Sequence, residues 1–95
     1  MNDVRQNHAL SRFELEVDGH IAFASYRQSG DVLTMTHTET PSALRERGIG
    51  ERLVVGTLQQ MRAQGLKVRP LCSFVRHVIS RHPEFQDLLA QDSLA

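Results

Sequence analysis

Residues 45–50 read Arg-Glu-Arg-Gly-Ile-Gly and lie between a strand-like segment and a helix-like segment. The first turn of a helix has backbone N–H groups without intrahelical partners, and the helix dipole adds to their attraction for anions. Glycine lets a ligand approach the backbone closely, although it is also common in ordinary turns. The stretch therefore predicts an anion-binding loop. It is neither a Walker loop, because no Gly-Lys-Ser/Thr follows, nor a full dinucleotide fingerprint, because Leu53 occupies the third glycine position.

The segment before this loop has the period-two pattern of β-strands. Residues 12–17 alternate polar and apolar side chains, and an Asp-Gly pair at 18–19 is typical of a hairpin turn. Residues 20–27 continue the pattern, and a Ser-Gly-Asp turn at 29–31 leads into residues 32–38, which are rich in β-branched side chains. These segments predict a three-stranded antiparallel meander.

After the loop, apolar residues recur at helical spacing until Gly65, a plausible C-terminal cap; they are Ile49, Leu53, Val54, Leu58 and Met61. Residues 66–71 predict a short buried strand, and Ser73 is a suitable N-cap for a second helix. Pro83 fits the first turn of a final short helix through Leu89. The predicted order is βββαβαα, a mixed α/β (α+β) fold.

Ninety-five residues fit one domain, and we expect a single domain over residues 1–95 with an ordered core at about 12–89. Residues 1–9 have no pattern, and we expect the acidic tail after Leu89 to fray. The single cysteine, Cys72, cannot form an internal disulfide, and no apolar run approaches the roughly 18 residues of a membrane span. We therefore expect a reducing, cytoplasmic setting, no membrane partner and no metal centre.

The formal net charge of zero hides an uneven distribution. Residues 1–44 carry −3, residues 45–83 carry +6 and residues 84–95 carry −3. The basic middle coincides with the predicted anion-binding loop and suits one small polyanion. Only five aromatic residues are present and no reading-helix motif is found, so we expect no nucleic-acid partner.

Four motifs in this order resemble one known family. They are His-Thr-Glu-Thr-Pro at 37–41, Arg-x-x-Gly-x-Gly at 45–50, Pro-Leu-Cys-Ser-Phe-Val at 70–75 and Arg-His-Pro-Glu at 81–84. Together they resemble the small single-domain acetyltransferase-like subfamily of the GNAT (N-acetyltransferase) superfamily, over roughly residues 12–89. The resemblance implies a GNAT-like fold and transfer of an acetyl group from acetyl-coenzyme A to an unidentified amine of a protein, peptide or small molecule.

The same resemblance implies a set of residues for the cofactor. Backbone amides around residues 47–51 would hold the pyrophosphate of coenzyme A, and the end of the third strand would line its pantetheine arm. Arginines of the basic middle, among them Arg81, are candidates for phosphate contacts or, alternatively, ordinary surface charges. The predicted cofactor-binding residues are Thr38, Thr40, Arg45, Arg47, Gly48, Ile49, Gly50, Glu51 and Arg76.

Cys72 is the first candidate for the chemistry. It follows a predicted strand and precedes a helix N-terminus, where the helix dipole lowers the pKa of a thiol, so it could accept an acetyl group. The position also resembles the proposed active-site cysteine of the family. The alternative is a small buried hydrophobic residue that ends a strand. His77, one helical turn beyond Ser73, is a further possible proton carrier.

His37 and Glu39 are the candidates for a general base. By the period-two rule they share one strand face, which we expect to continue the face of Leu33 and Met35 and to line the cofactor cleft. Alternatively, they are an ordinary sheet histidine and an exposed carboxylate. Many superfamily members place a tyrosine on the late helix to protonate the leaving thiolate, but the only tyrosine here is Tyr26, in the second strand.

Two other functional classes remain open from the sequence. A coenzyme A or acyl-coenzyme A binding module without turnover would use the same loop but would need neither Cys72 nor a base. A structural or interaction domain would need none of these residues. Only short turns join the first strands, so we expect an acceptor groove that is open or completed by a partner, and a monomer or weak oligomer.

Overall fold

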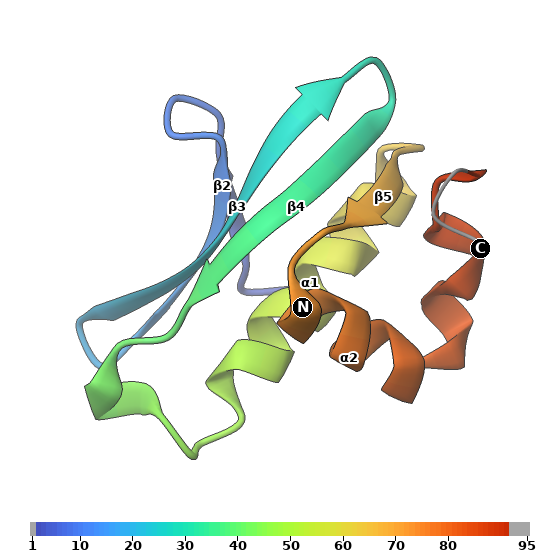
Figure 1. Ribbon diagram of the computed structural model, residues 1–95. Helices are drawn as coiled ribbons and strands as arrows, with labels where there is room; N and C mark the ends of the chain where they lie inside the picture. Colours follow the sequence, from blue (N-terminus) through green and yellow to red (C-terminus); the bar gives the residue numbers. More distant parts are fainter. Residues whose placement is uncertain (1, 92–95) are drawn as a thin grey trace.

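The computed structural model describes residues 2–91 and contains one five-stranded sheet covered by helices (Figure 1). The strand order is β1-β2-β3-β4-β5, and all neighbours are antiparallel except β4 and β5, which are parallel. The mixed α/β fold is as predicted. The elements are β1 (Arg5–Asn7), β2 (Arg12–Val17), β3 (His20–Ser29), β4 (Val32–Glu39), η1 (Ser42–Leu44), α1 (Ile49–Ala63), β5 (Lys67–Pro70), α2 (Ser73–Arg81) and η2 (Pro83–Leu88).

The core lies between the sheet and the helix layer. Phe13 and Leu15 of β2 are buried on the face that carries Ala22 and Ala24 of β3, as the alternation predicted. Helix α1 packs across β2 and β3, and α2 packs against β4 and β5. Burial of this apolar face supplies the main stabilisation of the fold.

Helix α1 ends where its sequence predicted. The amide of Gly65 donates to the carbonyl of Arg62 at 3.2 Å, and the amide of Leu66 donates to that of Met61 at 2.9 Å. These two bonds form a Schellman motif with Gly65 in the left-handed conformation, at φ +72°. The motif turns the chain directly into β5, which pairs with β4.

A β-bulge interrupts the pairing of β3 with β4. Tyr26 lies opposite Met35, but Ser25 lies opposite His37, so Thr36 is an extra residue on β4. Cross-strand partners point to the same face, and an extra residue therefore reverses the alternation beyond it. From His37 onward, the odd-numbered residues of β4 point away from the helices.

Three local features differ from the sequence prediction. Strand β1 was not predicted, because its residues are polar, yet it pairs with β2 from Arg5↔Glu14 to Asn7↔Arg12 and extends the sheet beyond the expected start at residue 12. The capping position of α2 is occupied by Cys72, not by Ser73. The final helix is 3₁₀.

The C-terminal segment also joins the sheet. Leu89 forms a parallel bridge with Val68, and the amide of Ala90 donates to the carbonyl of Val68 at 2.8 Å. The expected fraying concerns the tail after Leu89, of which residues 92–95 lie outside the described residues.

Candidate active site

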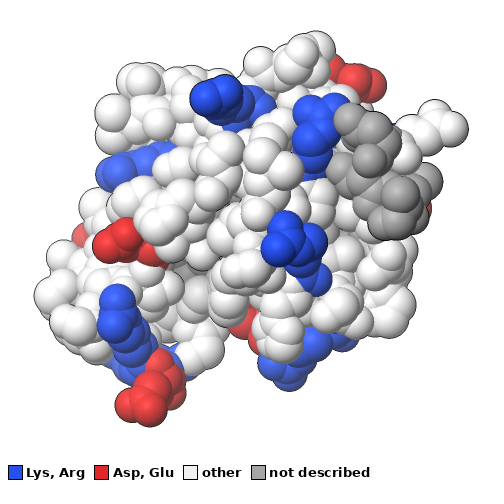
Figure 2. All heavy atoms as spheres, in the orientation of Figure 1, with Lys and Arg blue, Asp and Glu red and all other residues white. Residues whose placement is uncertain are grey.

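A groove of ≈ 290 Å³ lies where the end of β4, the loop before α1 and helix α2 meet. One wall is Thr40 together with residues 44–46 and 48–51, and the other wall is a face of α2. Figure 2 shows basic side chains spread over this side of the molecule, with acidic side chains among them near the loop. The predicted anion-binding loop therefore lines a groove.

The N-terminus of α1 supplies hydrogen-bond donors to this groove. The first helical bond runs from the amide of Arg52 to the carbonyl of Gly48, and no side chain caps the helix. Within residues 2–91, the amides of residues 48–51 have no acceptor. Four unpaired N–H groups at the positive end of a 15-residue helix form a site suited to an anion.

Gly50 lets the backbone of α1 lie close to Phe74 and Thr40 in the groove. A Cβ atom at this position would lie 3.1 Å from the ring of Phe74 and 3.3 Å from the hydroxyl of Thr40. Only glycine fits here without displacing one of them. The loop residues Gly48, Ile49, Gly50 and Glu51 and the strand-end residue Thr40, all predicted for the cofactor, are thus brought together.

Of the three arginines predicted to bind the cofactor, only Arg45 lines the groove. Arg45 lines the groove and donates from Nε to the carbonyl of Thr40 at 3.2 Å. Arg47 points to the β2–β3 turn, where its Nη1 lies 2.9 Å from a carboxylate oxygen of Asp18. Arg76 donates to the carbonyls that end β5, at 3.0 Å and 2.9 Å, and lies outside the groove.

Cys72 lies at the junction of β5 and α2, with its Sγ 3.6 Å from the hydroxyl oxygen of Thr38. The bulge at Thr36 places Thr38 on the helix side of β4, opposite Ala24. Burial raises the pKa of the Cys72 thiol, but the amides of Val75 and Phe74 and the Thr38 hydroxyl favour the thiolate, and the net pKa is lowered.

His37 and Glu39 contact each other, with His37 Nε2 and Glu39 Oε1 2.9 Å apart, and both side chains are more than half exposed. They share a face as predicted. The expectation that this face continues that of Leu33 and Met35 is wrong, because the bulge turns His37 and Glu39 to the outer face. There the ring of His37 lies 6.3 Å from that of Phe23.

Comparison with known proteins assigns the chain to a family. A family model described as GCN5-related N-acetyl-transferase matches residues 12–88. The chain belongs to this family. Its fold is also similar to that of a GCN5-like protein from Staphylococcus aureus solved in solution by NMR, with a TM-score of 0.69 and 23% identity over 94% of this chain and 88% of the other.

As a member of the GCN5-related N-acetyltransferases, this chain is classed as an acetyltransferase. The match also confirms the resemblance to the GNAT superfamily found in the sequence. Tyr26 does not line the groove, because it is buried and its hydroxyl accepts a hydrogen bond from Gln6 of β1 at 2.9 Å. Within residues 2–91, no helix is long and apolar enough to cross a membrane, and no three His, Cys, Asp or Glu side chains are arranged so that they could hold a metal ion.

Sequence reasoning missed one wall of the groove. Phe74, His77 and Arg81 of α2 line it together, yet Phe74 was given no role at a site and His77 was considered only for proton transfer. Their spacing of three and four residues places them on one helix face and could have indicated this wall.

Proposed function

We propose that this protein transfers the acetyl group of acetyl-coenzyme A to an amine of an unidentified acceptor. The observation that carries the proposal is the set of unpaired amides at residues 48–51 in the groove. The residues fit the group, because Gly50 leaves the space that a Cβ would fill and Arg45 adds a positive charge. When bound, acetyl-coenzyme A supplies an acetyl thioester as the donor.

The amides of residues 48–51 would hold the pyrophosphate, and Thr40 and Thr38 would line the path of the pantetheine arm. This path follows the end of β4, whose pairing with β5 stops at Met35↔Pro70. Beyond this point the edge of β4 is not paired with β5. A thioester at this edge would lie between the Cys72 side and the His37–Glu39 side.

The pair His37–Glu39 on the outer face would remove a proton from the amine before or during its attack. Neutral imidazole or carboxylate can accept that proton, and a neutral amine is the required nucleophile. Two routes for the acetyl group remain within the proposal. In the first, the amine attacks the thioester directly and the coenzyme thiolate leaves. In the second, the Cys72 thiolate attacks first and forms acetyl-Cys72 with release of the coenzyme thiolate, after which the amine attacks acetyl-Cys72 and the Cys72 thiolate leaves.

An acceptor screen that reads out free coenzyme A tests this function. We expect amine-dependent release above the hydrolysis background, reduced in Glu39→Gln and His37→Ala. Absence of release with every amine, together with intact binding of acetyl-coenzyme A, would favour the second candidate, a non-catalytic coenzyme A binding module. That candidate is supported by the absence of a tyrosine from the groove.

Intact-mass measurement separates the two routes. Incubation with acetyl-coenzyme A adds one acetyl group to the protein if Cys72 is an acyl carrier, and Cys72→Ala abolishes the addition. An acetyl group that persists in Cys72→Ala would exclude this route and leave direct transfer.

A further inference from the structure

Helix α2 presents a single stripe of side chains to the groove. Phe74, His77 and Arg81 are spaced by three and four residues and all line the wall opposite the loop. The unpaired amides of α1 form the other wall. The groove therefore has groups suited to an anion on two different elements, the unpaired amides of α1 and the guanidinium of Arg81 on α2.

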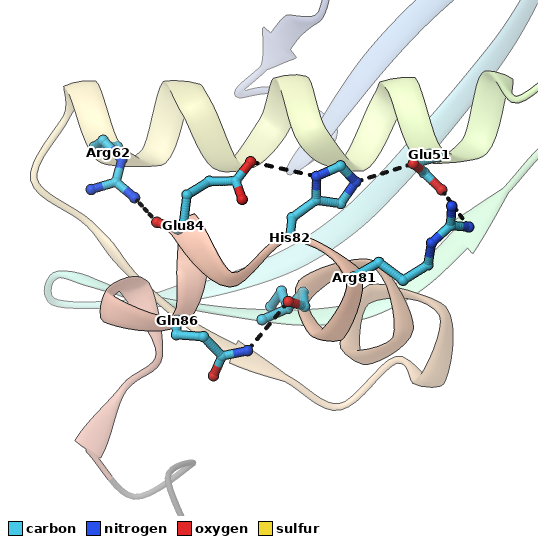
Figure 3. A network of polar contacts seen from close by, with 7 residues as sticks. Glu51, Arg62, Arg81, His82, Glu84 and Gln86 are labelled. Carbon is cyan, nitrogen blue, oxygen red and sulfur yellow. Dashed lines mark hydrogen bonds and ion pairs between the residues drawn. The ribbon is translucent and has the colours of Figure 1, made fainter.

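Arg81 is held at the rim of the groove by Glu51. Its Nη1 lies 3.1 Å from Glu51 Oε1, while Glu51 Oε2 lies 3.1 Å from His82 Nε2 (Figure 3). His82 in turn lies 3.5 Å from Glu84 through Nδ1. These contacts hold the Glu51 carboxylate between Arg81, which is cationic, and His82, which is cationic when protonated. The negative charge of Glu51 in the groove is therefore compensated by its neighbours.

The guanidinium of Arg81 nevertheless remains open to solvent. Its side chain is 59% exposed, whereas that of Glu51 is 33% exposed. One nitrogen contacts Glu51, and within residues 2–91 the other N–H groups of the guanidinium have no polar partner. A planar fork of donors that is anchored on one side is well prepared to bind a phosphate on the other.

Coenzyme A carries two kinds of phosphate, the pyrophosphate and a separate monophosphate on the 3′ position of its ribose. The α1 amides provide donors for one of these groups. We infer that Arg81 binds the 3′-phosphate of the coenzyme A donor, so that this chain prefers acetyl-coenzyme A over the same thioester without the 3′-phosphate. The inference rests on the proposed function and assigns the specificity of its donor site to α2.

Calorimetric titration with acetyl-coenzyme A and with 3′-dephospho-acetyl-coenzyme A tests the inference on the unmodified protein. One charge-assisted contact corresponds to roughly a tenfold difference in Kd between the two ligands. Arg81→Gln raises the Kd for acetyl-coenzyme A until it is close to the Kd for 3′-dephospho-acetyl-coenzyme A. The Kd for 3′-dephospho-acetyl-coenzyme A itself stays nearly unchanged. Arg81→Lys, which keeps the charge but not the fork, retains part of the preference.

Arg52→Gln is the matched control. Arg52 is a similarly exposed arginine near the start of α1, but it pairs with Asp3 at 3.3 Å and does not line the groove. Arg52→Gln removes one positive charge, as Arg81→Gln does, but keeps the preference for acetyl-coenzyme A over the 3′-dephospho ligand. If both ligands bind equally well to the unmodified protein, the inference is wrong and the proposed function stands. If neither binds, both are wrong.

Discussion

At the scale of single residues, the environment of Cys72 is decided by three neighbours. The sulfur lies at the N-terminus of α2, near the amides of Val75 and Phe74, and 3.6 Å from the hydroxyl of Thr38. These groups outweigh the effect of burial and lower the pKa of the thiol. A larger thiolate fraction near neutral pH is what either an acyl carrier or a reactive thiol needs.

Alkylation of Cys72 by iodoacetamide measures this pKa directly, because the chain has only one cysteine. We expect the rate to rise with pH at a midpoint below the value of about 8.5 for an ordinary thiol. Thr38→Val removes a donor to the thiolate and shifts the midpoint upward, whereas Thr36→Val, on the same strand, does not. A midpoint at or above 8.5 in the unmodified protein would contradict the account.

The location of Cys72 and of the loop glycines could be predicted from the sequence, since both follow from where a strand ends and a helix begins. The orientation of His37 and Glu39 could not. The extra residue at Thr36 has no marker in composition or periodicity, because one threonine in a segment where every second residue is threonine suits either a regular strand or a bulge. A single extra residue in β4 reversed which of the following side chains face the helices.

At the scale of elements, strand β1 depends on a close contact with α1. Val4, just before β1, packs against Gly56 in the middle of the helix, and Asn2 Nδ2 donates to the Gly56 carbonyl at 2.7 Å. Gln60 also donates to the carbonyl of Val4. This explains why the strand was missed: its polar residues have no apolar alternation, and tertiary contacts before the strand hold it in place.

Gly56→Ala tests that contact. The added Cβ would overlap both Val4 and Asn2. Overpacking of this kind costs up to about 3 kcal/mol, which outweighs the gain of about 1 kcal/mol in helix propensity. We therefore expect a lower free energy of unfolding in chemical denaturation. Val4→Ala in the same chain removes the closest of these contacts, so the double variant loses less than the sum of the two single variants. Strict additivity would show that the two positions do not touch.

At the scale of the whole molecule, the acidic ends of the chain fold back on the basic middle. Arg52 pairs with Asp3 and Arg47 with Asp18, while Arg62 contacts both oxygens of Asp87 at 2.8 Å and 2.9 Å. The segment charges of −3, +6 and −3 therefore compensate one another in space. Sequence counting located the charge, but only the fold shows that much of it is neutralised and that the groove side chains Arg45 and Arg81 remain accessible.

This arrangement makes stability depend on pH in the acid range. The hydrogen bond from Arg62, stronger than the opposing effect of burial, lowers the pKa of Asp87, and the contact with His82 lowers that of Glu51. A carboxylate with a lowered native pKa stabilises the fold above its unfolded pKa of about 4, and this contribution is lost as the pH falls through the native value.

Urea denaturation at a series of pH values from 7 to 2 is the corresponding measurement. We expect the free energy of unfolding to fall below about pH 4, and to fall less in Asp87→Asn, which has no carboxylate to protonate there. Asp31→Asn removes an exposed turn carboxylate without an ion pair among the described residues, and should keep the full dependence. Equal curves for the unmodified protein and Asp87→Asn would refute the role of this pair.

The central claim is that the start of α1 binds the phosphates of an acetyl donor. Titration of the ¹⁵N-labelled protein with acetyl-coenzyme A, followed by amide NMR spectra, tests it most directly. We predict saturable shifts at the amides of Gly48, Ile49 and Gly50, larger than at any residue of β1 or β2. Unchanged signals of these three amides at millimolar acetyl-coenzyme A would contradict the account.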